Sequence, residues 1–181
     1  MLDIKLKYKD IEIVNIEKEN IEDIFYMMKS NENEVNVDYH PLTKVEELED
    51  TFIEYYLSEC EFFIKIMYRS YLVGLIKGRA EFKNPNEIWI LYFLKNRYKL
   101  EDREWYNIIH NLEIYFFKQY GIDDFYVVVN NNNLNLINIF KKNGFSISRI
   151  YEKNKYDNIN NNEIVLKKLR HVNRIKYYIW K

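Results

Sequence analysis

The sequence has few of the residues that cross-link, bend or interrupt a chain: one cysteine, two prolines and four glycines. A lone cysteine, Cys60, cannot form an internal disulfide. The apolar runs are short, and even IWILYFL at 88–94 is far below the roughly 20 residues that cross a bilayer. The first residues do not follow the charged, apolar and small-residue order of a secretory leader. We therefore expect a cytoplasmic protein with no membrane partner.

A strong net charge is also missing. The chain has 27 basic and 28 acidic side chains, with a formal net charge of −1. This balance argues against a nucleic-acid-binding protein, which carries a clear excess of positive charge. The charges are unevenly placed, because acidic residues predominate before residue 61 and the segment 166–181 contains basic residues but no acidic ones.

The hydrophobic content predicts a folded domain. At 181 residues, with 48% hydrophobic and 17% aromatic residues, the chain can bury the core of one domain without disulfides or metals. Its periodicity predicts the order β α α β β β α β α β β, an α+β fold with a mixed, mostly antiparallel sheet of about seven strands and four helices. We expect one domain over 1–169, with the basic and aromatic tail 170–181 packed on it.

Metal-binding spacing is lacking as well. The three histidines, His40, His110 and His171, lie far apart in the sequence, and Cys60 has no second ligand at a suitable distance along the chain. Zinc sites are built from closely spaced pairs of such residues. We expect no metal site.

One motif does point to a function. A buried strand is predicted at 124–129, and it is followed by the stretch NNNNLNLINIFKKNGF at 130–145. Asparagine is a good helix N-cap and Gly144 is a typical C-terminal stop, so a helix is predicted between them. Together with the element order, this stretch resembles the second half of the signature of the GNAT superfamily of acyl-CoA-dependent N-acyltransferases. The positions that match that signature are Asn133, Leu136, Phe140, Gly144 and Phe145.

The resemblance implies acetyl-CoA as co-substrate and a primary amine as acceptor, with direct attack of the amine on the thioester. It places the pantetheine arm along the strand at 87–94 and the pyrophosphate at the turn that opens the following helix. The residues implied for acyl-CoA binding are Leu91, Phe93, Leu94, Tyr98, Lys99, Leu100, Asp102, Arg103, Asn133, Phe140 and Lys142.

Two features depart from the family pattern. The turn KNRYKLEDREW at 95–105 has none of the glycines that usually let backbone N–H groups close on the pyrophosphate. Its basic residues Arg97, Lys99 and Arg103 are expected to replace the lost amide contacts by charge. Phe140 replaces the tyrosine that often protonates the departing thiolate, and phenylalanine has no proton to donate.

Acyl transfer to an amine needs a base for the amine proton and an acid for the thiolate. Glu87 begins the central strand, near where several family members carry a catalytic carboxylate, and the alternative is a solvent-facing strand-end glutamate. Tyr92 could supply the missing phenol, and the alternative is a packing role. A catalytically degenerate GNAT-fold binding module is the alternative for the whole chain.

The partners are predicted only by class. Acidic side chains before residue 61 favour a cationic amine or a basic peptide as acceptor. The tail contains Arg170, Arg174 and Trp180, and it is predicted to pack on its own domain or on a second copy in a homodimer.

Overall fold

The structure is a computed structural model and describes residues 1–31, 43–96, 100–151 and 163–169. It divides into two compact units. The first unit comprises Met1–Arg79 and Leu91–Glu101, and the second comprises Ala80–Ile90 and Asp102–Lys181. The sequence shows no linker at these boundaries, and the single domain expected over 1–169 stays a prediction.

The first unit begins with a hairpin, continues through helices and ends in longer strands. Its elements are β1 (Lys5–Tyr8), β2 (Ile11–Asn15), the short 3-10 helix η1 (Lys18–Asn20), α1 (Ile21–Ser30), α2 (Val45–Leu57), β3 (Glu61–Tyr68), most of β4 (Tyr71–Glu81) and the end of β5 (Glu87–Lys95).

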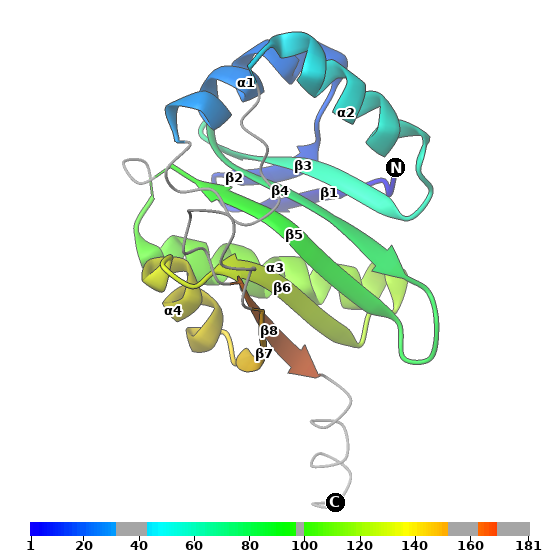
Figure 1. Ribbon diagram of the computed structural model, residues 1–181, viewed down its shortest axis with the longest axis vertical. Coiled ribbons are helices and arrows are strands. Elements are labelled where there is room, and N and C mark those ends of the chain that lie inside the picture. Colours follow the sequence, from blue (N-terminus) through cyan, green and yellow to red (C-terminus); the bar gives the residue numbers. More distant parts are fainter. Residues whose placement is uncertain (32–42, 97–99, 152–162, 170–181) are drawn as a thin grey trace, which may run out of the picture. The chain divides into compact units, whose positions relative to one another are not determined.

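The core of the first unit lies between its strands and the helices α1 and α2, which cover one face of these strands (Figure 1). Helix α1 contributes apolar residues at helical spacing, including Ile21, Ile24, Phe25 and Met28. They pack with side chains from the strands, among them Phe63. Burying each such side chain contributes about 1.5–3 kcal/mol to folding, so the amphipathic pattern of α1 explains its position.

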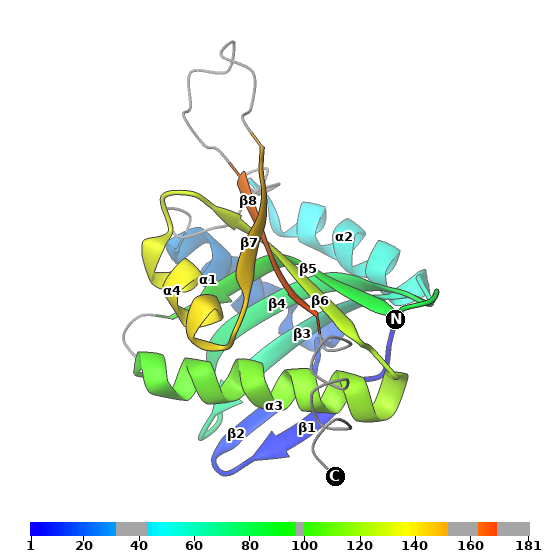
Figure 2. The ribbon, with the colours of Figure 1, turned by 90° about the horizontal axis from the view of Figure 1, so that it is seen from below.

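The second unit contains the remaining elements: the start of β5, α3 (Asp102–Tyr120), β6 (Asp124–Asn130), α4 (Leu134–Lys142), β7 (Ser146–Tyr151) and β8 (Glu163–Leu169). In Figure 2, α3 is the long helix that runs across the picture below α4, β7 and β8. The buried face of α3 follows from its sequence, because Trp105, Ile108, Leu112 and Phe116 recur at helical spacing.

The strands form an eight-stranded sheet in the order β1-β2-β3-β4-β5-β6-β8-β7. The pairing of β5 with β6 is parallel and covers Glu87–Ile90 and Asp124–Val127, as predicted for a strand–helix–strand unit. The pairs β1–β2, β2–β3, β3–β4, β6–β8 and β7–β8 are antiparallel. The α+β fold with four α-helices is confirmed for the described residues, and β1 is one strand more than predicted.

Two turns have the left-handed backbone geometry that their positions require. Arg69 and Ser70 both have positive φ, as a two-residue hairpin turn between β3 and β4 requires. Gly144 ends α4 with a φ of 87°. None of the helices in the described ranges is both long and apolar enough to cross a membrane.

An ion pair joins α3 to β8 inside the second unit. Lys168 Nζ lies 2.5 Å from Glu113 Oε2, and the two side chains are 20% and 9% exposed. The same ammonium lies 5.7 Å from the ring centre of Phe145. Because little water reaches either group, each charge depends on its partner.

We expect Lys168→Met to lower the free energy of unfolding by about 2–3 kcal/mol, because it leaves the Glu113 carboxylate buried and unpaired. The double variant Lys168→Met/Glu113→Leu should recover much of that loss. Urea unfolding of both variants measures this. Arg69→Met, which removes an exposed ion pair with Asp10, is the control and should change stability much less. If Lys168→Met and Arg69→Met lower the free energy of unfolding equally, the Glu113–Lys168 pair does not have the stabilising role assigned to it.

Candidate active site

The end of β5 belongs to the first unit and carries three of the predicted acyl-CoA residues. Leu91 is half-buried, whereas Phe93 and Leu94 are buried, at 1% and 0% exposure. Beyond the strand, Asn96 donates its backbone N–H to Val73 O at 2.8 Å, which ties the end of β5 to β4. Because the side chains of Phe93 and Leu94 are so enclosed, these two residues can offer a ligand only their backbone.

Tyr92 lies between these residues and is 3% exposed. Its side chain belongs to the apolar cluster that β3, β4, α1 and α2 form in the first unit. The ammonium of Lys77, on β4, lies over the Tyr92 ring at 5.3 Å from its centre. The phenol is therefore a buried group beside a cation.

In the second unit, the starts of α3 and α4 lie next to each other. Asn135 Nδ2 donates to both carboxylate oxygens of Asp102, at 3.4 Å and 3.2 Å. The backbone N–H groups of a first helical turn have no partner within the helix, and the helix dipole adds positive potential there. Two such starts side by side form a region that favours an anion.

Asn133 is the N-cap of α4, as predicted. Its Oδ1 accepts a hydrogen bond from Leu136 N at 3.1 Å. This contact orients the first turn of α4 and satisfies one of its free N–H groups. Leu136 and Ile137 then face the core, so the capping asparagine and the apolar face together define where the helix starts.

Phe140 and Lys142 lie in the second half of α4. Phe140 is fully buried and packs edge-to-face on Phe145, with ring centres 5.1 Å apart. Phe145 N also donates to Phe140 O across the Gly144 turn. Lys142 is exposed. The phenylalanine that replaces the family's tyrosine thus has a core packing role.

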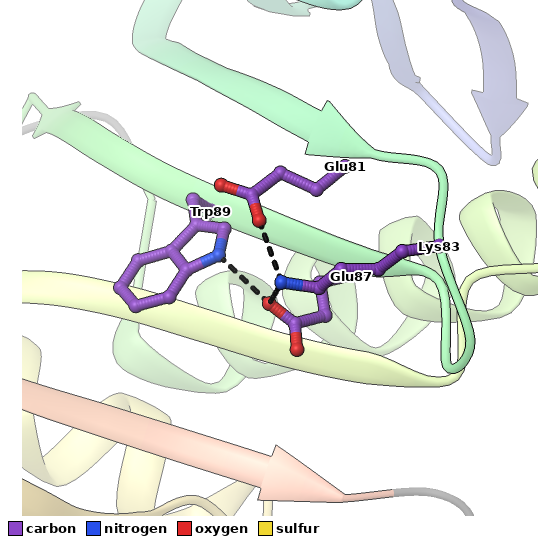
Figure 3. Close-up of polar contacts among 4 residues, drawn as sticks. All are labelled: Glu81, Lys83, Glu87 and Trp89. Atoms are coloured by element: carbon purple, nitrogen blue, oxygen red, sulfur yellow. Dashed lines mark hydrogen bonds and ion pairs between the residues drawn. The ribbon is translucent and has the colours of Figure 1, made fainter.

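Glu87 begins β5 in the second unit and is not a free solvent-facing carboxylate. Its Oε2 lies 2.9 Å from Lys83 Nζ and accepts a hydrogen bond from Trp89 Nε1 at 3.2 Å. Lys83 also contacts Glu81 at 2.7 Å (Figure 3). The Trp89 ring stacks on Tyr126 of β6 at 4.4 Å. Glu87 is therefore part of a polar and aromatic cluster at the start of the strand.

Burial raises the pKa of Tyr126, and the nearby carboxylates of Glu87 and Asp124 raise it further. Tyr126 therefore stays a neutral phenol beside this cluster. Glu87 and Tyr92 are separated by five positions of one strand, and an odd separation directs side chains to opposite faces of a regular strand. The two predicted catalytic side chains thus have different surroundings.

A family profile for an acetyltransferase (GNAT) domain matches residues 13–165, which covers all the elements just described except β1, the start of β2 and the end of β8. The chain belongs to the GNAT acetyltransferase family. No curated protein sequence matches it.

This GNAT protein also resembles solved structures. A ribosomal L7/L12 alpha-N-protein acetyltransferase in complex with coenzyme A has a TM-score of 0.77 at 12% identity, covering 92% of this chain and 98% of that one. Spermidine N-acetyltransferase from Vibrio cholerae, in complex with CoA and spermine, has a TM-score of 0.75 at 13% identity, covering 91% and 98%.

An acetyl transfer enzyme from Salmonella typhimurium, which modifies the N-terminal serine of L7/L12, has a TM-score of 0.75 at 13% identity, covering 90% and 96%. At these identities the likeness establishes the GNAT fold.

The glycine-free turn is described only in part. Tyr98 and Lys99 lie outside the described residues, as does the tail 170–181. Leu100 is half-buried, and Asp102 and Arg103 are exposed at the start of α3. Of the predicted binding residues, the structure therefore brings Asp102 close to the first turn of α4, which Asn133 caps, and Arg103 follows Asp102 in the first turn of α3.

Two residues of the GNAT chain were missed by the sequence analysis. Asn135 has the same residue type as its capping neighbour, and its contact with Asp102 joins segments that are distant in the chain. Lys77 is surrounded by apolar strand residues, in YLVGLIKGRAEF, and this placement of a charge in a buried strand is a signal that could have found it.

Other features of the structure have no place in this site. A hollow of about 730 Å³ lies over β1, β2 and β3 of the first unit, lined by residues such as Lys5, Glu12 and Lys65. None of the predicted site residues lines it. Within the described ranges, no group of three or more His, Cys, Asp or Glu side chains could hold a metal ion.

We expect Asn133→Ala to lower the free energy of unfolding by about 1 kcal/mol, because it removes the cap of α4. Asn133→Ser keeps an accepting oxygen at the cap and should therefore retain most of the wild-type free energy of unfolding. Urea unfolding gives the values, with Asn132→Ala as the matched control from the same asparagine run. If Asn132→Ala costs as much as Asn133→Ala, the asparagines are interchangeable and Asn133 has no special place.

Proposed function

We propose that this protein is an N-acetyltransferase that moves an acetyl group from acetyl-CoA to a primary amine. Family membership supports acetyl transfer as the reaction class. Two of the similar structures are complexes with coenzyme A. The observation in this chain that carries the proposal is the adjacency of the α3 and α4 starts, because paired helix N-termini suit the pyrophosphate of CoA.

The helix starts suit the pyrophosphate of CoA, but acidic side chains lie beside them. Asp102 and Glu104 are acidic and lie in the first turn of α3, where they oppose a polyanion. Asp102 is engaged by Asn135, and exposed Arg103 offers a cation in the same turn. The groups that would hold the pyrophosphate are thus the first backbone N–H groups of α3 and the Asn135 N–H of α4, with Arg103 and, from the sequence, Lys99. Leu134 N and Leu136 N of α4 already donate to Asn132 O and Asn133 Oδ1.

For the pantetheine arm we propose the backbone of Leu91, Phe93 and Leu94, since the side chains of the last two are committed to the core. Tyr92 is proposed to donate its proton to the thiolate that leaves when the amine attacks the acetyl carbonyl. A phenol O–H can donate a proton to the thiolate as it forms. Phe140 cannot take this role because it has no donor.

The role of Glu87 as the base that removes the amine proton stays a prediction. Both Lys83 and Trp89 contact its Oε2, so this oxygen is already occupied. A base must reach the proton that it removes, directly or through one water. An alternative that these contacts support is a structural role, in which Glu87 holds the loop between β4 and β5 together.

The acceptor is proposed as a cationic amine or a basic peptide. Similar structures include a spermidine N-acetyltransferase and an alpha-N-protein acetyltransferase. Helices α1 and α2 of this chain carry an excess of carboxylates, which would attract a cation. These acidic residues are Glu22, Asp23, Glu46, Glu47, Glu49, Asp50 and Glu54.

A non-catalytic binding module is the second candidate function. Two observations favour it: Phe140 is a core residue without a donor, and acidic side chains occupy the first turn of α3. Both would follow from the loss of acyl-CoA chemistry in a fold that is retained. Acetyl-CoA binding separates the two functions.

We expect acetyl-CoA to bind, weakly, and to stabilise the folded state. At 100 times its dissociation constant, a ligand adds about 2.7 kcal/mol, which for this chain length raises the melting midpoint by roughly 5–10 °C. A melting curve with millimolar acetyl-CoA measures the shift. Adenosine 3′,5′-bisphosphate controls for nonspecific anion binding and should give a smaller shift.

Two charge reversals on the same helix locate the binding site. Arg103→Glu, in the first turn of α3, should reduce the shift, whereas Lys118→Glu, in its last turn, should leave it unchanged. No shift with several millimolar acetyl-CoA would contradict the enzyme and leave the binding module as the account.

A further inference from the structure

The first unit contains an ammonium group enclosed by aromatic rings. Lys77 Nζ lies 5.4 Å from the ring centre of Tyr55, 5.3 Å from that of Phe63 and 5.3 Å from that of Tyr92. Each ring is within the roughly 6 Å over which a cation is attracted to an aromatic face. The rings come from α2, β3 and β5, and Lys77 is the cross-strand partner of Phe63 on β4.

This position is costly for a lysine. Burial lowers the pKa of Lys77 from its ordinary value, and the carboxylates of Glu61 and Glu54 partly oppose this effect. A leucine or methionine would fill the same space without the cost of desolvating a charge. A half-buried charged side chain held among aromatic rings is the kind of feature that recurs at functional sites.

The two phenols beside Lys77 are not equivalent. Burial, together with the charges of Glu61 and Glu54, raises the pKa of Tyr55 to about 12, and Arg79 on β4 acts in the opposite direction. Tyr55 therefore stays protonated near neutral pH. Tyr92 lies on the strand proposed to carry acetyl-CoA, and it is the phenol that the proposed reaction uses.

We infer that Lys77 is a positioning residue, which holds its ammonium over the Tyr92 ring and stabilises the phenolate formed when Tyr92 protonates the departing thiolate. In that step the amine nitrogen bonds to the acetyl carbon and the C–S bond breaks. The C–S electron pair goes to sulfur, which takes the Tyr92 proton. The proton lost by the amine leaves through solvent, and Tyr92 is reprotonated from solvent. The inference rests on the proposed function.

The charged form of Lys77 is the useful one, so the effect has a defined pH dependence. Below the pKa of Lys77 the ammonium is present and stabilises the Tyr92 phenolate. As the pH rises through this pKa, which lies below the ordinary value of 10.5, the stabilisation is lost. We expect the turnover number to fall over that range.

The direct test is the titration of Tyr92, which needs neither acetyl-CoA nor an acceptor. In protein with ¹³Cζ-labelled tyrosine, the Tyr92 NMR signal is assigned as the one lost in Tyr92→Phe. Lys77→Met should raise the pKa of Tyr92 by roughly one unit or more, the size expected for losing an opposite charge at this distance. Lys77→Arg, which keeps a cation, should leave it close to the wild-type value.

Lys65→Met is the matched control. Lys65 lies on β3 of the same unit and bonds to Asn20 at 2.6 Å, so its loss should not move the Tyr92 signal. The inference is overturned if Tyr92 titrates alike in wild type and Lys77→Met, or if the wild-type Tyr92 signal does not titrate below about pH 12. Either result would make Lys77 a packing residue.

A kinetic arm separates this inference from the proposed function. If the enzyme is active, Tyr92→Phe should lower the turnover number by about 10²- to 10⁴-fold. Lys77→Met should lower it with little change in KM for acetyl-CoA, and Lys77→Arg should restore it and move the alkaline limb to higher pH. If the wild type releases no CoA with any amine, the proposed function fails while the NMR titration still decides the Lys77–Tyr92 coupling.

Discussion

The parallel pairing of β5 with β6 is the constraint on which the proposed site depends. Parallel strands cannot be joined by a tight turn, so a helix must cross between them. Helix α3 therefore starts after β5, and α4 starts after β6. Neighbouring parallel strands deliver their following helices to the same edge of a sheet, and the Asn135–Asp102 contact shows the two helix starts together. The proposed anion-binding character of this region would be a consequence of chain order.

The two units contribute different groups to the proposed function. The second unit supplies backbone donors and dipoles at the helix starts. The Asn133 cap fixes the start of α4, and the Glu113–Lys168 pair ties α3 to β8. The first unit supplies a buried phenol, Tyr92, in an apolar cluster and a half-buried ammonium, Lys77, over its ring. Low polarity strengthens electrostatic effects, which is why one ammonium can matter to one phenol there.

Much of the fold could be predicted because its signals are local. Alternation and helical spacing located the strands and helices that were predicted, and the cap Asn133 and the stop Gly144 bounded α4 correctly. The missed strand β1 alternates lysines with Leu6 and Tyr8, a weak signal because it is short and lies at the sheet edge. Its pairing with β2 through a tight turn at Lys9, which has positive φ, supplies the missing support.

The site was harder to predict because its contacts join distant parts of the chain. Glu87 looked like a free strand-end carboxylate, but Lys83 folds back across the loop to pair with it. Lys77 and Tyr92 lie on different strands. Sequence periodicity alone shows neither the contacts of Lys77 with aromatic rings nor the lowering of its pKa. By contrast, α4 could be predicted from the family signature, because that signature depends only on residue spacing within one segment.

The most direct test of the central claim is the release of free CoA from acetyl-CoA, followed with a thiol reagent and by mass spectrometry of the acceptor. The assay is run with and without a panel of polyamines and basic peptides. The account predicts release that requires an amine, with one acetylated acceptor formed for each CoA released. Binding of acetyl-CoA without amine-dependent release across that panel would contradict it.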